Sequence, residues 1–388
     1  MITVEEALAR VFALVMPLPT ENAPLGLANG RYMPGPAIAK RDQPPFAASA
    51  MDGYAINGES RPGATFTVIG EAGAGHAFNA TIAPGQAIRI FTGAPVPDGS
   101  TRVVIQEDVN ATGALIALRY HLDTGTNIRP LGQDFRAGST LAPRLLRPND
   151  IALLAAMNIA EVPVTRRPVV AIIATGDELV MPGENPRPDQ IIASNSFALK
   201  AIVEDAGGTT RMLPIARDTE GALRTVLEMA KGADLIVTIG GASVGDHDLV
   251  GKVAAQMGMD RTFYKIAMRP GKPLMAGRLH GVPMLGLPGN PVSAIVCGHL
   301  FLLPMLRAML GLGAHPPQTR TARLATPLPA NGPRAHYMRA RLADGLITPF
   351  DRQDSALLTI LTEANALLIR PIGDGPREAG ETVAYLPI

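Results

Sequence analysis

The feature that most constrains this chain is a short apolar run that opens into a glycine-rich loop and two aspartates, at residues 233–248. The run 235–239 is too short for a helix and suits a strand buried on both faces. The glycines that follow allow sharp turns that present N–H groups to an anion, and they are Gly240, Gly241 and Gly245. Oxygen atoms suited to a hard cation belong to Ser243, Asp246 and Asp248. An ordinary glycine turn capped by aspartates remains the alternative for this stretch alone.

Length and composition restrict the class of protein. A chain of 388 residues exceeds one ordinary core, so about two to four domains are expected. The formal net charge of +1 gives no electrostatic footprint for nucleic acid or an anionic membrane. A single cysteine, Cys297, excludes an internal disulfide and favours a reducing compartment. The apolar stretch 292–303 is followed by Pro304 and Arg307, so we interpret it as a core helix and the protein as cytoplasmic.

Local patterns divide the chain into segments. Thr3 and Glu6 form a capping box for an amphipathic helix, and proline-rich extended pieces follow as far as residue 45. Short β-type runs separated by glycine turns indicate a mostly β domain over residues 46–138. The sequence 147–150 resembles a cap for a helix at 151–157. From residue 316 onward, β-type runs predict a small C-terminal β domain.

Between residues 168 and 315, strand and helix patterns alternate, which is the signature of a parallel sheet covered by helices. The predicted strands are 169–174, 211–215, 235–239, 262–266 and 284–287. The predicted helices are 196–206, 219–230, 248–257 and 291–310, and Asp218 is predicted to cap the second of them. Because ligands of such sheets bind beyond the carboxyl ends of the strands, the acids, bases and glycines found there predict a pocket for an anionic, phosphorylated ligand and a cation.

One loop of this predicted pocket carries three positive charges. Lys265, Arg269 and Lys272 lie near Pro270 and Pro273, which restrict the main chain around them. Such a rigid cationic loop suits a tetrahedral oxyanion. A solvated basic turn is the alternative.

Motifs along the whole chain resemble the molybdopterin molybdenumtransferase family, which comprises the bacterial MoeA proteins and the E domain of gephyrin. They are 49–55 (SAMDGYA), 89–94 (RIFTGA), 127–134, 174–179 (ATGDEL), 240–248 (GGASVGDHD), 270–273 (PGKP) and 288–291 (PGNP). Each is weak alone, but their shared order and spacing are specific.

The resemblance implies a multidomain fold of α/β and β parts. A parallel-sheet α/β domain of the molybdopterin-binding, MogA-like type is expected at 168–315, and a mostly β domain at 46–138 is inserted into an elongated linker and dimerisation domain at 1–45 and 139–167. A small β-barrel-like domain is expected at 316–388. The family's active site forms in a homodimer, where the β domain of one subunit faces the α/β domain of the other. This would explain why some implied site residues lie far along the chain from the glycine loop.

The resemblance also implies an activity, the transfer of molybdate onto adenylylated molybdopterin with release of AMP, assisted by Mg²⁺. The implied catalytic residues are Asp52, Thr92, Asp134, Glu178 and Asp246. The implied metal ligands are Asp246, Glu178 and Asp248. The implied substrate-binding residues are Gly240, Gly241, Ser243, Asp218, Lys265, Arg269, Lys272, Pro273, Arg339 and Ser355. Other proteins of molybdenum cofactor biosynthesis are possible partners.

The sequence departs from the family pattern at two positions of the implied oxyanion site. Asp354 stands where the family has glycine, and a carboxylate beside Ser355 opposes oxyanion binding unless it turns away or pairs with Arg352. Arg269 stands where many members have lysine.

Two alternative functions remain open. One alternative is an adenylyltransferase that makes the adenylylated pterin from ATP, although its relatives usually carry Gly-Gly-Thr-Gly at positions 240–243 and lack flanking β domains. The other is a non-catalytic molybdopterin carrier or scaffold.

Overall fold

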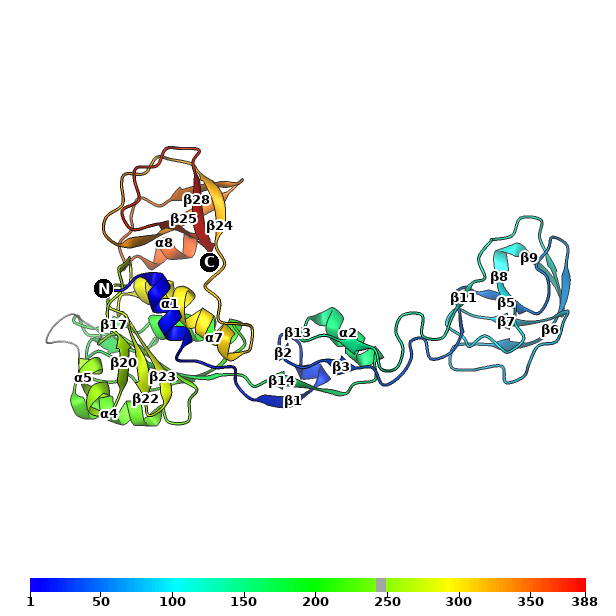
Figure 1. The fold of residues 1–388 in the computed structure, drawn as a ribbon, viewed down its shortest axis with the longest axis horizontal. Coiled ribbons are helices and arrows are strands. Elements are labelled where there is room, and N and C mark those ends of the chain that lie inside the picture. The colour runs from blue at the N-terminus through cyan, green and yellow to red at the C-terminus, as the bar shows by residue number, and fades with distance from the viewer. Residues whose placement is uncertain (242–248) are drawn as a thin grey trace. The chain divides into compact units, whose positions relative to one another are not determined.

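The computed structural model describes residues 1–241 and 249–388 and divides the chain into two compact units. The first unit contains Met1–Glu21 and Thr165–Ile388, and the second contains Asn22–Val164 (Figure 1). The predicted residues Ser243, Gly245, Asp246 and Asp248 lie outside the described residues.

The first unit is built on a six-stranded sheet in the order β18-β15-β19-β23-β22-β20. Its strands are β15 (Val169–Ala174), β18 (Thr209–Met212), β19 (Leu235–Ile239), β20 (Asp260–Phe263), β22 (Met275–Leu279) and β23 (Val282–Leu287). Strands β18, β15, β19 and β23 are parallel, as predicted. Strand β22, which the sequence pattern did not reveal, pairs antiparallel with both β23 and β20.

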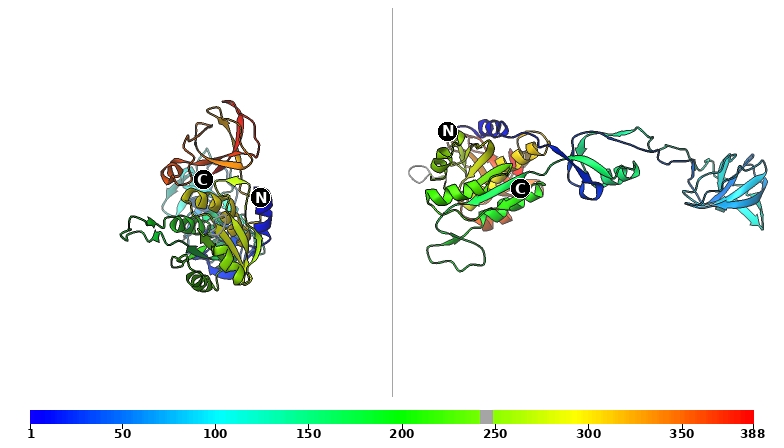
Figure 2. Two further views of the ribbon diagram at one scale, coloured as in Figure 1. Left: turned by 90° about the vertical axis from the view of Figure 1, so that its left-hand side faces the viewer. Right: turned by 90° about the horizontal axis from the view of Figure 1, so that it is seen from below.

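Side chains of the central strands alternate between two apolar cores, which explains why the predicted buried runs are continuously apolar. Leu235 and Val237 pack into one core, and Ile236 packs into the other. Helices α1 (Val4–Phe12), α3 (Asn195–Asp205), α6 (Pro291–Cys297) and α7 (Leu303–Met309) supply the first core, whereas α4 (Glu220–Met229) and α5 (Leu249–Gln256) supply the second. Figures 1 and 2 show these helices on either side of the strands.

The N-terminal helix α1 belongs to this α/β core. Its predicted capping box is confirmed, because Glu6 N–H donates to the Thr3 hydroxyl and Thr3 N–H donates to the Glu6 carboxylate, both at 3.1 Å. Ala7 and Val11 are fully buried in the first core. Residues 1–21 therefore pack with the α/β part of the chain, and not with the linker segment in which the sequence prediction grouped them.

Two helix starts differ from the predicted ones. Thr219, and not Asp218, caps α4, because its hydroxyl accepts from Ala222 N–H at 3.3 Å. Helix α2 (Pro148–Ala156) starts at Pro148, three residues before the predicted position, and the Asp150 carboxylate accepts from Arg147 N–H at 2.9 Å. In both cases the choice among adjacent polar residues depends on main-chain geometry that a pattern does not contain.

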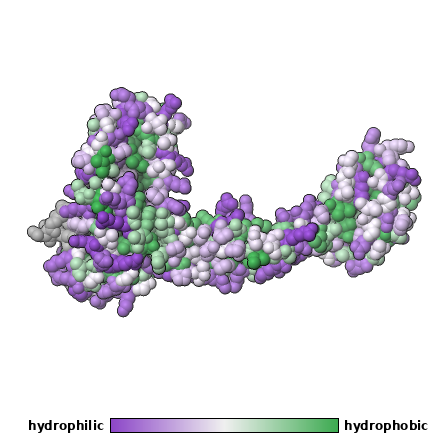
Figure 3. Space-filling view, in the orientation of Figure 1, coloured by the Kyte–Doolittle hydropathy of each residue, from purple (hydrophilic) through white to green (hydrophobic). Residues whose placement is uncertain are grey.

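The predicted long helix 291–310 consists of α6, a π-helical turn at Gly298–Leu302, and α7. In the described part of the chain, Pro291–Met309 is the one helix long and apolar enough to cross a membrane. Of its most apolar window, 78% is buried inside the protein, and its side chains belong to the first core. The segment is therefore a core helix, as predicted. On the face shown in Figure 3, hydrophilic residues predominate over the α/β domain and the C-terminal domain.

The C-terminal part of the first unit is a closed five-stranded β-barrel, as the resemblance implied. Its strands are β24 (Arg320–Leu324), β25 (Ala335–Ala343), β26 (Leu346–Pro349), β27 (Ala366–Arg370) and β28 (Thr382–Pro387), with a short helix α8 (Leu358–Glu363). The order β25-β26-β24-β28-β27 is closed by pairing of β25 with β27. Strand β21 (Met268–Arg269) leaves the α/β domain and pairs in parallel with β25, which joins the two domains into one unit.

The second unit contains a six-stranded sheet in the order β8-β5-β7-β6-β10-β9. The strands are β5 (Gly53–Ile56), β6 (Thr65–Ala72), β7 (Gln86–Ile90), β8 (Arg102–Ile105), β9 (Val109–Thr112) and β10 (Leu115–Leu118). Two-stranded ladders precede and follow it: β1 (Thr20–Pro24) with β14 (Glu161–Thr165), β2 (Tyr32–Met33) with β13 (Arg144–Leu145), β3 (Ala37–Ile38) with β12 (Thr140–Leu141), and β4 (Ala48–Ser49) with β11 (Ile128–Arg129). The predicted mostly β character of 46–138 is confirmed by this sheet.

A part-buried ion pair at the start of the α/β sheet provides a first prediction. Asp234 accepts from both terminal nitrogens of Arg166, at 2.6 and 2.9 Å, and from Val169 N–H at 2.8 Å. Burial opposes the charged carboxylate, but the hydrogen bonds from Arg166 and Val169 outweigh it and hold the pKa of Asp234 below its usual value of 3.8. We expect Asp234→Asn to lower the free energy of unfolding by about 2 kcal/mol in urea titrations near neutral pH.

The pH dependence of this effect has a defined sign. Because the pKa of Asp234 is lowered on folding, its contribution is complete above the unfolded-state pKa and is lost as the pH falls through the folded-state pKa. The difference between wild type and Asp234→Asn should therefore shrink in acid. Asp189→Asn is the matched control, since the Arg187–Asp189 pair is 66% and 72% exposed and should contribute little to the free energy of unfolding. Equal losses in the two variants would contradict the assignment.

Candidate active site

A cleft of about 1160 Å³ lies where the carboxyl ends of β15, β19 and β23 meet the C-terminal barrel. Both walls belong to the first unit. The residues predicted from the sequence that line it are Glu178, Asp218, Gly240, Gly241, Arg269, Lys272, Pro273 and Ser355. The strand-end pocket inferred from the order of strands and helices is thus present, and the barrel supplies its other wall.

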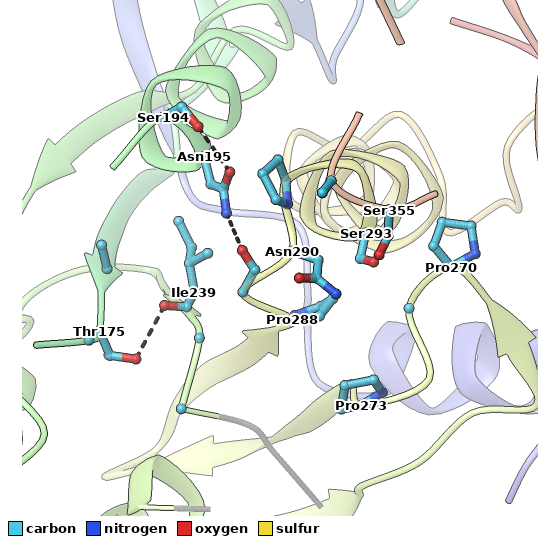
Figure 4. A pocket seen from close by; sticks show the side chains of 18 of the residues that line it. Thr175, Ser194, Asn195, Ile239, Pro270, Pro273, Pro288, Asn290, Ser293 and Ser355 are labelled. Atoms are coloured by element: carbon cyan, nitrogen blue, oxygen red, sulfur yellow. Dashed lines mark hydrogen bonds between the residues drawn. The ribbon is translucent and has the colours of Figure 1, made fainter. Parts of the chain in front are cut away.

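The glycines after β19 allow the main chain to pass close to the end of β15. Gly240 and Gly241 have φ of 89° and 63°, and a Cβ on Gly241 would lie 2.3 Å from the side chain of Val250. Thr175 donates its hydroxyl hydrogen to the Ile239 carbonyl at 3.3 Å (Figure 4). Gly240 N–H donates to the Leu287 carbonyl at 3.0 Å, so this N–H is part of the sheet and not of an anion cradle. Gly240 contributes space at the floor of the cleft.

Two carboxylates face the cleft from neighbouring loops. The Arg217 guanidinium donates to the carbonyls of Gly176, Asp177 and Leu179 at 3.0–3.3 Å, which fixes the loop that carries Glu178. Asp218 N–H donates to the Asp177 carboxylate at 3.0 Å and ties the second loop to the first. Within residues 1–241 and 249–388, no group of three His, Cys, Asp or Glu side chains is arranged to hold a metal ion.

The basic loop divides between the cleft and its surroundings. Arg269 and Lys272 line the cleft, whereas Lys265 does not, and its ammonium lies 5.2 Å from the centroid of the Tyr264 ring. Burial, together with the nearby charge of Arg334, lowers the pKa of Arg269. In the described part of the chain, neither Arg269 nor Lys272 has a carboxylate partner. Both charges are therefore available to an anionic ligand.

The barrel wall of the cleft is a loop held from behind by Arg339. This arginine is 1% exposed and does not line the cleft. It donates through Nη1 to the Asp354 carbonyl at 2.7 Å and through Nε to the Gln353 amide oxygen at 3.3 Å, and burial lowers its pKa. In this structure Arg339 is a residue that positions the loop of Ser355, and not the direct cleft contact that the resemblance implied.

The main chain of Ser355 is hydrogen-bonded to helix α6. Its carbonyl accepts from Val292 N–H at 3.0 Å, and Figure 4 shows its side chain next to that of Ser293. The Asp354 carboxylate accepts from Ala356 N–H at 2.8 Å, so in the described part of the chain it pairs with this main-chain group and not with Arg352. Asp354 nevertheless lines the cleft. A negative charge therefore remains beside Ser355.

The remaining predicted residues belong to the second unit. Asp52 and Thr92 form a pair, because the Asp52 carboxylate accepts from the Thr92 N–H and hydroxyl, each at 2.7 Å. The Thr92 N–H and then its hydroxyl, together with Arg89, lower the pKa of Asp52. Asp134 lines a separate cavity of about 600 Å³ with Gln43 and Arg129. Within the second unit, Asp52 and Thr92 are therefore hydrogen-bonded to each other, whereas Asp134 lines a cavity whose lining includes neither of them.

Comparison with known proteins decides the family. Models of the MoeA N-terminal region (domains I and II), of the "Probable molybdopterin binding domain" and of the MoeA C-terminal region (domain IV) match residues 2–158, 171–308 and 321–388. The molybdopterin molybdenumtransferase 2 of Mycobacterium tuberculosis is 37% identical over 90% of this chain and 90% of its own. The chain belongs to the molybdopterin molybdenumtransferase family. It is therefore a transferase of molybdenum cofactor biosynthesis.

Other relatives agree over the full length. The molybdopterin molybdenumtransferase of Nostoc sp. is 35% identical over 95% of this chain and 89% of its own. A crystal structure of the molybdopterin biosynthesis MoeA protein of Pyrococcus horikoshii is 29% identical, with a TM-score of 0.86 over 100% of this chain and 99% of its own. The multidomain fold implied by the sequence motifs is that of the family.

Several residues of the cleft were missed by sequence reasoning. Arg334 and His336 face it from the barrel, and Asn195 faces it from the start of α3, where its side-chain amide donates to the Gly289 carbonyl at 2.7 Å (Figure 4). Arg334 and His336 flank Ala335, the first residue of β25, and this spacing of two is a local signal that both point to one side. Only the long-range pairing of β21 with β25 shows that this side is the cleft.

Proposed function

We propose that this enzyme transfers molybdenum from molybdate to adenylylated molybdopterin and releases AMP. The observation that carries the proposal is the composition of one cleft, in which Arg269, Lys272 and Ser355 lie opposite the strand-end carboxylates Glu178 and Asp218. Unpaired cations and a hydroxyl suit a tetrahedral dianion, and the strand ends suit the phosphorylated pterin. The names of the relatives, molybdopterin molybdenumtransferases, support the same reading.

The residues of the cleft act mainly by positioning the reactants. Lys272 and Arg269 offset the charge of molybdate, and the Ser355 hydroxyl donates to one of its oxygens. Arg339 keeps the Ser355 loop in place through the Gln353 amide and the Asp354 carbonyl. Holding molybdate against the pterin dithiolene converts an encounter between two ligands into a reaction within one complex.

Mg²⁺ is the proposed metal cofactor, with Glu178, Asp246 and Asp248 as its proposed ligands. Of these, only Glu178 lies among the described residues, and its exposed carboxylate in the cleft has the oxygen donors that Mg²⁺ prefers. When bound, the ion would neutralise charge on the pyrophosphate that joins AMP to the pterin. Asp218 provides a second carboxylate on the same wall.

We also propose that the enzyme acts as a cytoplasmic homodimer, in which Asp52, Thr92 and Asp134 complete the cleft of the partner subunit. Mixing Asp52→Asn subunits with Lys272→Gln subunits tests this arrangement. If the sites are shared, each single variant is inactive and the mixture recovers about a quarter to a half of wild-type activity, since some mixed dimers hold one intact site. A mixture as inactive as its components would contradict shared sites.

The direct test of function is incubation of the purified protein with adenylylated molybdopterin and Mg²⁺, with and without molybdate or tungstate, and measurement of AMP by chromatography. AMP release that depends on the oxyanion is the expected result. Pyrophosphate release from ATP and molybdopterin would instead identify an adenylyltransferase. Binding of molybdopterin without turnover would identify a carrier. Either result would overturn the proposal.

A further inference from the structure

His336 is a buried side chain of the cleft that the proposed reaction does not use. It lines the cleft, yet only 6% of its surface is exposed. Among the described residues, its imidazole has no hydrogen-bond partner. Because this side chain lines the cleft and no described protein group is hydrogen-bonded to it, a ligand in the cleft is the partner that this geometry leaves room for.

Positive charges face His336 from the elements packed around it. Arg269 is its register partner on β21, and Arg370 is its register partner on β27. Arg334 precedes it, and Arg339 follows it along β25. Strand β26 carries no charged residue, and α8 carries only Glu363, which is exposed at its end.

The two acids near this group, Asp374 and Asp354, already have hydrogen-bond partners. Asp374 binds Arg370 at 2.5 Å and Arg377 at 2.6 Å. Asp354 lies on the Ser355 loop, and its charge acts on Arg339. Arg269 and Arg334 have no carboxylate partner in the described part of the chain. The charge around His336 is therefore positive on balance.

This environment keeps the imidazole neutral. Burial, and then the charges of Arg269, Arg339, Arg370 and Arg334, lower the pKa of His336 from 6.5 to about 3. A neutral ring beside two uncompensated guanidinium groups is a site at which the charge of a ligand decides the protonation state.

We propose that His336 binds the oxyanion substrate directly and takes up a proton when an inorganic tetrahedral dianion enters beside Arg269 and Arg334. The inference rests on the proposed oxyanion site and adds a residue and a charge requirement to it. The two negative charges of the ligand offset the two unpaired arginines, so the repulsion that keeps the imidazole neutral falls. The protonated ring then donates a hydrogen bond to a ligand oxygen. A monoanion such as chloride supplies less charge, so His336 favours dianions.

Proton uptake gives anion binding a pH dependence of definite sign. The pKa of His336 is higher in the complex than in the free protein, and between these two values the complex holds one proton more. Binding therefore strengthens as the pH falls through this interval, by at most about tenfold per pH unit. Above the pKa of the complex, the dependence disappears.

The test is calorimetric titration of the full-length protein with sodium sulfate, a tetrahedral dianion whose own charge is constant where histidine titrates. Titrations are made about one pH unit below 6.5, the ordinary histidine value, in two buffers that differ in ionisation enthalpy. For the wild type we expect different apparent enthalpies in the two buffers, equivalent to several tenths of a proton taken up per sulfate. His336→Asn should bind sulfate several-fold more weakly and without this difference.

His299→Asn is the matched control, because burial alone lowers the pKa of His299. It should keep the wild-type proton uptake. Sulfate binding without proton uptake in the wild type, or with unchanged uptake in His336→Asn, would overturn the inference while leaving the oxyanion site intact. A wild-type protein that binds neither sulfate nor molybdate would overturn the inference and the proposed function together.

A second measurement applies if His336→Asn does not fold, as judged by circular dichroism. The chain contains 7 histidines, and NMR follows their imidazole signals in the wild-type protein. One of them should begin to titrate in the range of ordinary histidine only when sulfate is present. Identical titration of all signals with and without sulfate would overturn the inference.

Discussion

Replacing Lys272 by Gln is expected to reduce molybdate-dependent AMP release about 100-fold, because the side chain supplies a positive charge at the oxyanion and the substitution keeps its approximate length. Lys272 lines the cleft and, among the described residues, has no carboxylate partner. Its charge is therefore free for the ligand, and its removal leaves Arg269 as the only charged residue of this loop in the described lining of the cleft. Initial rates at several molybdate concentrations measure the loss.

Two other lysines provide controls with the same change of charge. Lys200→Gln removes a surface ion pair with Glu204 on α3 and should leave the rate unchanged. Lys265→Gln tests the geometry more sharply, because Lys265 belongs to the same basic loop in sequence but lies over the Tyr264 ring and outside the cleft. It should cost less than about tenfold. A larger loss for Lys265→Gln than for Lys272→Gln would contradict the placement of the two side chains.

The central strands were predictable because burial on both faces leaves a continuous local signal. Residues 169–174 and 235–239 match β15 and β19 at both ends, since most of their residues belong to one apolar core or the other. The pocket followed from topology, because parallel strands bring their carboxyl ends to one edge. Loops that are distant in sequence therefore meet in the cleft without any direct sequence signal for their contact.

Strand β22 shows why other parts of the fold and of the cleft could not be predicted from the sequence. Met275–Leu279 has no β-branched residue and contains Gly277, where a Cβ would lie 2.3 Å from the Asp260 carbonyl oxygen. The close approach of the neighbouring strand β20 requires glycine at this position, whereas the local sequence pattern predicts a turn there. The barrel wall is similar, since the roles of Arg339 and His336 depend on the pairing of β25 with β21 and β27.

The motif at 49–55 leads to the second large effect, which concerns stability. Gly53 begins β5, and a Cβ at this position would lie 1.9 Å from the Val104 carbonyl oxygen on β8. Because the obstacle is main chain in a paired strand, it cannot move aside as a flexible side chain would. The motif therefore needs glycine for close strand packing, directly beside Asp52, whose carboxylate accepts from Thr92 N–H.

Gly53→Ala is accordingly expected to destabilise the β sheet of the second unit by about 3 kcal/mol or more. Hydrogen exchange followed by mass spectrometry on the full-length chain measures this locally, as lost protection in peptides that contain β5 and β8. Gly73→Ala is the matched control, because a Cβ there meets nothing within 4 Å. Its protection should equal that of the wild type. If Gly53→Ala were protected to the same extent as Gly73→Ala, the close approach of β5 and β8 would not be what requires glycine in the motif.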